Sequence, residues 1–422
     1  MPCREAPGAG YDSGVILRSL YLDGFKSFRT AQIFFGPFTL LVGTNASGKS
    51  NVQDALRFLH GCAQGFTIAE VIGEKWGPGG LLLWRGIRGG VREIARAGED
   101  IFALYVDAEE PVAGEQYSYK VVVELSEEGK TLEVRDESLE AGHRVVFRQD
   151  PNRSIFFPDS ERRWRHYSAG RTALVRIAED DDVEKTRRND ARLLVDSLKN
   201  IRFLDLAPDA MRHPSTPGEQ VLGDRGENLS TVLYNLTADA AKKEALLGWL
   251  RSLTPLDVVD LRFHEDLTGR VLVYLVESSG REISAKSASD GTLRFLALVA
   301  ALLSSESGHV FFIEEIDNGL HPTRLHLLLD VIEQATRNFG CQVIATTHNP
   351  QLLAYLSPEA REDAVLLYRR EHEDASEAIR IVDLTDVRRI LESQDLGRLF
   401  ATGWLEDAVE LMETETRSKR AR

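Results

Sequence analysis

Several features that would place this 422-residue chain in a common class of protein are scarce or missing. The sequence has only three cysteines, and their wide separation fits neither a metal site nor a disulfide framework. No apolar run approaches the ~20 residues needed to span a membrane, and residues 1–14 contain no apolar segment typical of a secretion signal. We therefore expect a cytoplasmic protein that has no membrane partner.

Basic residues are also in deficit. The chain has 51 Lys and Arg against 66 Asp and Glu, a net charge of −15, so DNA or RNA could be bound only by a local patch. Two segments mix arginine with aromatic residues and are candidates for such a patch, with an ordinary salt-bridged surface as the alternative. Their central residues are Arg85 and Arg88 in the first, and Arg163 and Arg165 in the second.

One segment has a clear chemical meaning. Residues 43–50 read GTNASGKS, a G-x-x-x-x-G-K-S phosphate-binding loop between a strand-forming run and a helical segment. Gly43 and Gly48 let backbone amides approach phosphates closely, and the positive end of the following helix favours an anion. Lys49 would reach the outer phosphates and the Ser50 hydroxyl would ligate Mg²⁺. We predict a nucleoside triphosphate site, rather than a Gly-rich turn without a ligand.

Three later segments supply groups that hydrolysis requires. A buried strand at 310–313 ends in Glu314 and Glu315, of which one carboxylate can hold Mg²⁺ and the other can position or deprotonate water. His348 follows another short strand, where it could sense the γ-phosphate. Ser289 opens an apolar helix, and a helix N-terminus can bind an anion, although an ordinary helix cap has the same sequence.

The order of these motifs resembles the ABC-type ATPase core, within the group of SMC, Rad50 and RecF proteins. Asn45 in the loop, the run Phe-Lys-Ser-Phe at 25–28, Ser-Asp-Gly-Thr at 289–292 and the run at 315–322 make it most similar to stand-alone OLD-like and RecF-like AAA ATPases without a fused nuclease. The resemblance implies an α/β P-loop NTPase with an ABC-type head, ATP and Mg²⁺ as cofactors, and a homodimer joined by ATP.

The resemblance also implies roles for individual residues. The residues that would bind ATP are Gly43, Asn45, Gly48, Lys49, Ser50, Lys26 and Ser27. Mg²⁺ would be held by Ser50 and Glu314, and catalysis would use Glu315 and His348. Ser289 and Gly291 would form the signature turn that meets the γ-phosphate of a second subunit, and the D-loop would consist of Asn318, Gly319 and His321. No glutamine is easily assigned to the Q-loop of this family; Gln149 is a candidate and Gln116 a weaker one.

Pattern and resemblance together divide the chain into segments. We expect a flexible N-terminus at 1–14, ATPase lobe I at 15–100, an antiparallel β meander at 101–175, a helical insert at 176–256, ATPase lobe II at 257–405 and a tail at 406–422. Within these, residues 73–90 and 202–226 are expected to be loops, 229–253 two helices and 258–276 a strand pair. The segment between Ser50 and Ser289 lacks the heptads of long coiled-coil arms.

The function that the resemblance favours is an ATPase whose cycle controls a nucleic-acid process. Phage defence beside a separate effector or nuclease subunit is preferred, because no acidic cluster of a fused nuclease is evident in the tail. RecF-like DNA repair is the alternative. A transporter-type ATP-binding subunit and a nucleotide-gated scaffold of low turnover are less favoured.

Overall fold

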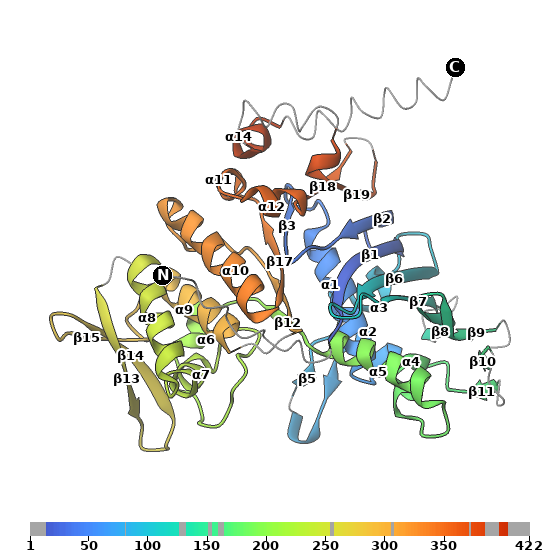
Figure 1. The fold of residues 1–422 in the computed structure, drawn as a ribbon, viewed down its shortest axis with the longest axis horizontal. Coiled ribbons are helices and arrows are strands. Elements are labelled where there is room, and N and C mark those ends of the chain that lie inside the picture. The colour runs from blue at the N-terminus through green and yellow to red at the C-terminus, as the bar shows by residue number, and fades with distance from the viewer. Residues whose placement is uncertain are drawn as a thin grey trace, which may run out of the picture.

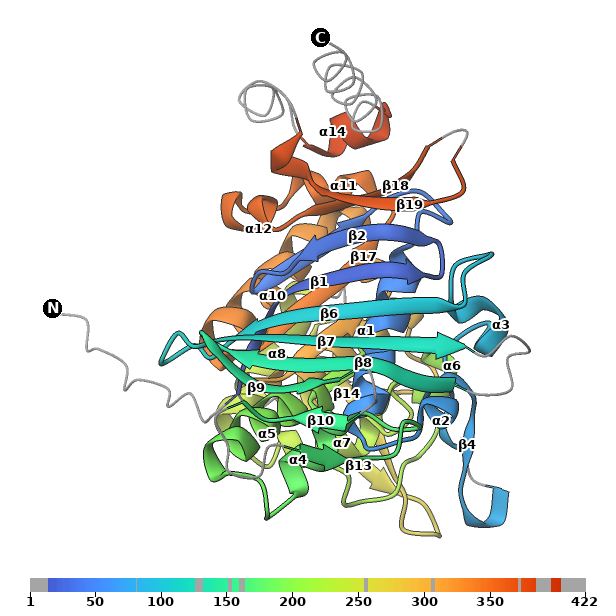
Figure 2. The ribbon, with the colours of Figure 1, turned by 90° about the vertical axis from the view of Figure 1, so that its right-hand side faces the viewer.

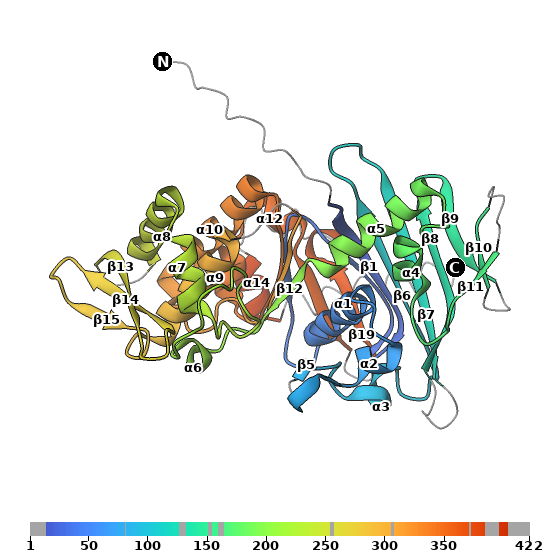
Figure 3. The same cartoon turned by 90° about the horizontal axis from the view of Figure 1, so that it is seen from below.

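A computed structural model describes residues 14–80, 82–125, 132–150, 154–158, 164–253, 257–304, 308–370, 373–384 and 396–403. Its framework is one mixed sheet of fourteen strands, in the order β11-β10-β9-β8-β7-β6-β1-β2-β19-β18-β3-β17-β16-β12 (Figure 1). A three-stranded sheet, β13-β14-β15, lies at the opposite end of the molecule from β11 (Figure 3). This is the α/β architecture that the sequence predicts.

The secondary-structure elements have the following bounds. The strands are β1 (Ile16–Phe25), β2 (Phe28–Phe34), β3 (Phe38–Val42), β4 (Lys75–Trp76), β5 (Leu82–Trp84), β6 (Ile101–Glu109), β7 (Gln116–Leu125), β8 (Leu132–Ala141), β9 (Arg144–Gln149), β10 (Ser154–Phe156), β11 (Trp164–His166), β12 (Ile201–Leu204), β13 (Val258–Glu265), β14 (Val271–Glu277), β15 (Glu282–Ser284), β16 (Val310–Ile313), β17 (Gln342–Thr347), β18 (Val365–Arg369) and β19 (Ser376–Arg380). The helices are α1 (Lys49–Ala63), α2 (Ile68–Ile72), α3 (Gly90–Ile94), α4 (Ala173–Glu179), α5 (Lys185–Lys199), α6 (Pro208–Met211), α7 (Leu229–Leu236), α8 (Ala240–Leu253), α9 (Asp290–Leu303), α10 (Leu325–Phe339), α11 (Pro350–Ala354), α12 (Pro358–Glu362) and α14 (Leu396–Ala401).

Five neighbouring strands, β12, β16, β17, β3 and β18, run parallel and bring their carboxyl ends to one edge. Side chains on the two faces of this part belong to two different hydrophobic clusters; Leu40 faces one and Leu41 the other. Because both faces are covered, these strands are short and continuously apolar, which is typical of parallel sheets. The edge where the carboxyl ends meet is where ligands bind in open α/β sheets.

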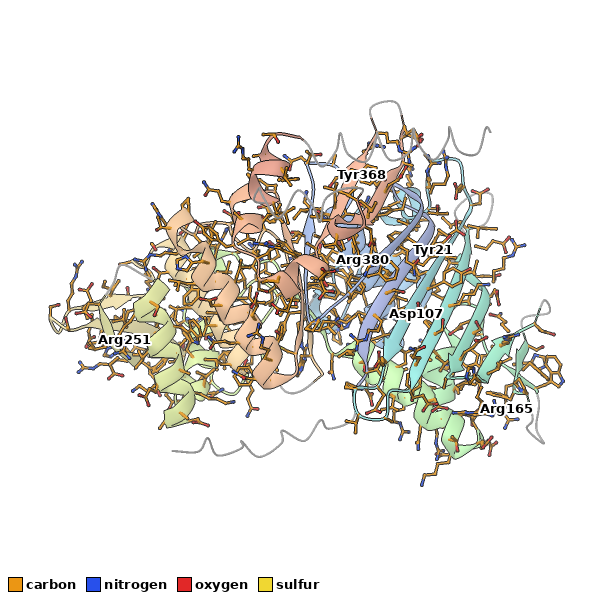
Figure 4. All side chains as sticks on the ribbon, turned by 45° about the horizontal axis from the view of Figure 1, so that its top comes forward. Tyr21, Asp107, Arg165, Arg251, Tyr368 and Arg380 are labelled. Carbon is orange, nitrogen blue, oxygen red and sulfur yellow. The ribbon has the colours of Figure 1, made fainter. Side chains whose placement is uncertain are left out.

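The antiparallel half of the sheet, β1 and β6 to β11, alternates buried and exposed side chains. Its buried side chains pack with those of α1, α2, α4 and α5. The other face carries polar and aromatic residues such as Tyr21 and Asp107, and no helix of the described residues covers it (Figures 2 and 4). Period-two alternation on a half-covered sheet is the signal that made the meander predictable.

Most expected elements are confirmed. The segment 229–253 forms two helices and 258–276 forms an antiparallel pair, both packed on α9 or its neighbours. Two expected loops were wrong. Residues 73–90 include the hairpin β4–β5, and 202–226 begins within β12, which pairs with β16 in the core sheet.

Candidate nucleotide-binding site

The phosphate-binding loop joins the end of β3 to α1 at the carboxyl edge of the parallel strands. Gly43 has φ 155° and Gly48 φ 109°, and a Cβ on Gly43 would lie 2.1 Å from the Leu367 carbonyl oxygen. Only glycine therefore fits position 43. Helix α1 has no side-chain cap at Gly48 and no acidic residue in its first turn. Its first amide groups consequently face the loop without a competing carboxylate, as anion binding requires.

A cavity of about 520 Å³ opens at this loop. The loop contributes one wall, the ends of β12 and β16 a second, and α9 a third. Its lining residues are Asn45, Ala46, Ser47, Gly48, Lys49, Ser50, Asn51, Arg88, Asp205, Leu206, Arg294, Phe295, Leu298, Ile313, Glu314, Glu315, Ile316, Asn318, Leu320 and Thr346.

The loop holds one ammonium on its own carbonyl oxygens and leaves one buried hydroxyl without a partner among the described residues. The Lys49 ammonium donates to the carbonyl oxygens of Gly43 (2.6 Å) and Thr44 (2.8 Å), and burial lowers the Lys49 pKa while the Glu315 charge opposes this. The Ser47 hydroxyl is buried and has no hydrogen-bond partner among the described residues. An orphaned hydroxyl and amides at the end of a cavity fit an anionic ligand such as a polyphosphate.

The two predicted carboxylates lie at the end of β16 and line the same cavity. Burial raises the pKa of Glu314, while Arg88 and a hydrogen bond from Ser50 counteract that effect. Glu315 has φ 45°, and its backbone amide donates to Thr346 Oγ1 (2.9 Å). This left-handed conformation is costly for a residue with a side chain and is characteristic of functional sites.

His348 follows β17, and its Nδ1 lies 3.8 Å from a carboxylate oxygen of Glu315. Asn318 donates to the other Glu315 oxygen at 3.3 Å. The predicted catalytic pair is therefore adjacent, and the Asn318 amide orients the carboxylate. Although His348 does not line the cavity itself, it lies beside the residue that does.

Lys26 and Ser27, predicted to bind ATP, do not line the cavity. The Lys26 ammonium contacts Asp54 (2.6 Å) and the carbonyl oxygen of Arg88 (2.6 Å) behind the loop. The Ser27 hydroxyl accepts hydrogen bonds from Asn51 and Ser376, both at 2.7 Å. Both side chains thus contact α1 and neighbouring segments, and their predicted contact with ATP stays a prediction.

The arginines expected to form nucleic-acid patches are dispersed. Arg88 lines the nucleotide cavity and pairs with Asp54, so it belongs to this site. Arg165 lies 3.7 Å from Asp180 and 3.8 Å from Asp182 at the outer end of the sheet (Figure 4), as a salt-bridged surface would. Arg85 is exposed, and Arg163 lies outside the described residues.

The signature turn and the D-loop lie together but outside the cavity. The Ser289 hydroxyl caps α9 by accepting from the Thr292 amide at 3.2 Å, which is the ordinary role the sequence left open. A Cβ on Gly291 would lie 2.1 Å from the Gly319 carbonyl oxygen, so the turn packs tightly on the D-loop. His321 is exposed and caps the turn that follows by accepting from the Thr323 amide. Of these residues, only Asn318 lines the cavity.

Several lining residues escaped the sequence reasoning. Asp205 follows β12, whose register places Leu204 opposite Ile313, so its carboxylate is next to Glu314. Gln149 and Gln116 lie on β9 and β7, and neither lines the cavity. Arg294, on the second turn of α9, also lines the cavity.

Two negative findings apply to the described part of the chain. It contains no group of three or more His, Cys, Asp and Glu side chains arranged to hold a metal ion by themselves. Helices long and apolar enough to cross a membrane are also missing from it. A divalent cation at this site would therefore need ligands besides carboxylate and imidazole, such as the Ser50 hydroxyl and phosphate oxygens.

Comparison with solved structures agrees with the fold. A solved SMC head bound to the C-winged helix domain of ScpA superposes with a TM-score of 0.50 at 16% identity, over 86% of this chain and 96% of that one. The SMC head domain from Thermotoga maritima gives a TM-score of 0.42 at 14% identity, over 86% and 98% of the two chains. At 16% identity, the likeness to the first of these structures concerns the fold alone.

Sequence comparison adds a local and a broad match. The chromosome partition protein Smc of Clostridium kluyveri is 47% identical over 49 residues, which are 11% of this chain and only 4% of that relative's length. A family model described as "AAA domain, putative AbiEii toxin, Type IV TA system" matches residues 38–354. Since that match spans most of the chain and the whole phosphate-binding site, the protein belongs to this AAA-domain family and is an ATPase. Its fold is similar to that of an SMC head domain.

Proposed function

We propose that the protein hydrolyses Mg²⁺-ATP in a composite site shared by two copies of the chain, which ATP joins. One observation carries this proposal. The loop, Glu314 and Glu315 converge on one cavity, whereas the signature residues Ser289 and Gly291 lie outside it on the same chain. A turn that does not line the cavity of its own chain is available to meet the nucleotide of a second copy.

The groups of the cavity have distinct tasks in this proposal. The α1 amides and Lys49 bind the phosphates, and Ser50 with Glu314 would hold Mg²⁺, which neutralises charge on the outer phosphates when bound. Glu315 orients the attacking water and accepts its proton. Its carboxylate is held in place by the hydrogen bond from Asn318 and by the left-handed backbone conformation of Glu315. His348 supports the Glu315 carboxylate from 3.8 Å.

The cellular process we infer is phage defence in the cytoplasm, with the ATPase acting beside a separate effector or nuclease. The family description, which includes a toxin of a type IV toxin–antitoxin system, supports defence over RecF-like repair. A solved SMC head carries a bound ScpA domain, which supports a protein partner for a head of this fold. Affinity purification from the host under phage challenge tests this: a co-purifying nuclease would favour defence, and a recombination protein would favour repair.

The composite site is tested with Glu315→Gln. Loss of the carboxylate should slow hydrolysis about 10²- to 10⁴-fold while ATP still binds, so that an ATP-bound dimer accumulates. Light scattering with Mg²⁺-ATP should report twice the 47.1 kDa chain mass, and no change in mass would argue against ATP-linked association. Phosphate release from the wild type, with and without DNA, separates an active enzyme from a scaffold, which would show negligible turnover in both.

A further inference from the structure

Behind the phosphate-binding loop lies a buried pair of opposite charges that the proposed mechanism does not use. Asp54, on the second turn of α1, and Lys26, in the β1–β2 turn, have side chains that are 2% and 8% exposed. The Lys26 ammonium lies 2.6 Å from Asp54 Oδ2. Burying two charges costs free energy that their attraction often does not recover, so the pair is weak evidence for a stabilising role.

Both charges also hold Arg88. The Arg88 Nε lies 3.2 Å from each Asp54 carboxylate oxygen, and the Arg88 carbonyl oxygen accepts from Lys26 at 2.6 Å. Lys26 and Asp54 thus fix Arg88 at two points, its backbone carbonyl oxygen and the Nε edge of its guanidinium. Because the guanidinium is planar and rigid, fixing its Nε and the backbone of Arg88 limits the directions in which its two other nitrogens can point.

The two other guanidinium nitrogens of Arg88, Nη1 and Nη2, lie at the nucleotide cavity. Its Nη2 donates to the Ser50 carbonyl oxygen, and its Nη1 lies 3.8 Å from Glu314. The side chain is 51% exposed and lines the cavity. One edge of Arg88 is therefore fixed by buried protein charges, and the other faces the space that phosphates would fill.

The backbone at Lys26 has an unusual conformation that accompanies these contacts. Lys26 has φ 51°, an unfavourable conformation for a residue with a side chain, and its amide donates to the Ile94 carbonyl oxygen at 3.0 Å. Gly89 and Gly90, which follow Arg88, also have positive φ. Strain retained at a turn whose side chain reaches one specific target points to a functional constraint.

We propose that Lys26 and Asp54 are positioning residues, which hold the Arg88 guanidinium at the phosphates without touching the nucleotide. This inference rests on the proposed function for the identity of the ligand, but it concerns binding by a single chain. Lys26, expected from the sequence to contact ATP, acts instead through Arg88.

The test is a double-mutant cycle on ATP affinity, measured with a fluorescent ATP analogue and Mg²⁺ on the full chain. Arg88→Ala should weaken binding about 10- to 100-fold, as expected for a charge-assisted contact, and Lys26→Met should weaken it about 3- to 10-fold. In the Arg88→Ala background, Lys26→Met should add no further loss. Equal losses of Lys26→Met in both backgrounds would show an independent contact or a general structural role and would overturn the proposal.

Further variants protect this test against a simple folding defect. Asp54→Asn should reproduce the Lys26→Met result, and Asp54→Glu should restore part of the affinity because the charge returns. Lys75→Met is the matched control, since Lys75 pairs with Glu70 at 3.2 Å away from the cavity, and its affinity should equal that of the wild type. ATP affinity is measured for a single chain, so a failure of ATP-linked dimerisation would not change the outcome of the double-mutant cycle. Likewise, a failure of the double-mutant cycle would not bear on dimerisation.

Discussion

The two halves of the proposed ATPase site differ in how complete they are within one chain. The P-loop half has a cavity, an orphaned buried hydroxyl at Ser47, and Lys49 resting on loop carbonyls. The signature half has an exposed turn at Ser289, whose hydroxyl is occupied in capping α9. The difference indicates that the first half can bind nucleotide alone, whereas the second needs a nucleotide presented from outside.

The signature half is nevertheless tightly packed against the D-loop. Gly291 packs so closely on Gly319 that any side chain at position 291 would meet the D-loop backbone. The D-loop in turn reaches the cavity through Asn318 and Glu315. Contact of a second chain with the signature turn could therefore be transmitted to the carboxylate of the first half.

The largest effect is expected from a substitution that disables the P-loop half alone. Lys49→Ala removes the charge that faces the outer phosphates, so ATP affinity should fall about 10- to 100-fold and ATP-linked association should disappear with it. Isothermal titration with Mg²⁺-ATP measures the affinity. Unchanged affinity would show that the cavity is not where ATP binds.

An intermediate effect isolates the signature half. Aspartate is as good a helix cap as serine, so Ser289→Asp should keep the stability of α9 while placing a negative charge toward the γ-phosphate of the second chain. Hydrolysis should fall about 10-fold or more, since repulsion of a few kcal/mol opposes association, while the affinity of a single chain for ATP stays unchanged. A matching loss of single-chain affinity would place Ser289 in its own nucleotide site.

The smallest effect concerns capping alone. Ser289→Ala removes the hydroxyl that accepts from Thr292, so unfolding by urea should require about 1 kcal/mol less free energy. Its melting transition, compared with that of Ser289→Asp, separates the cap from the anion contact. If both variants were equally destabilised, the loss of hydrolysis in Ser289→Asp could not be ascribed to charge.

The sequence predicted the P-loop half well because its signals are local. A fixed glycine spacing between strand and helix defines residues 43–50, and an apolar strand ending in two carboxylates defines Glu314 and Glu315. The groups that surround them were harder to assign. Strand β12 has only four residues and finds its partner β16 more than a hundred positions later, so Asp205 could not be placed beside Glu314.

Arg88 shows a second limit of sequence reasoning. Composition groups it with Trp84 and Arg85 as a basic, aromatic surface, but nothing local reveals that Asp54 and Lys26 turn it toward the cavity. The same limit applies to Lys26, whose motif indicates proximity to the nucleotide without stating whether contact is direct. Long-range ion pairs are set by tertiary packing, which a linear pattern does not contain.

Mixing two impaired variants tests the composite site most directly. Lys49→Ala lacks a working P-loop half and Ser289→Asp a working signature half, so only a mixed dimer contains one intact site. With random pairing, and if the two sites act independently, phosphate release should recover to about a quarter of the wild-type rate, because half the dimers would each hold one of two sites. No recovery above the two separate variants would contradict a site shared between chains.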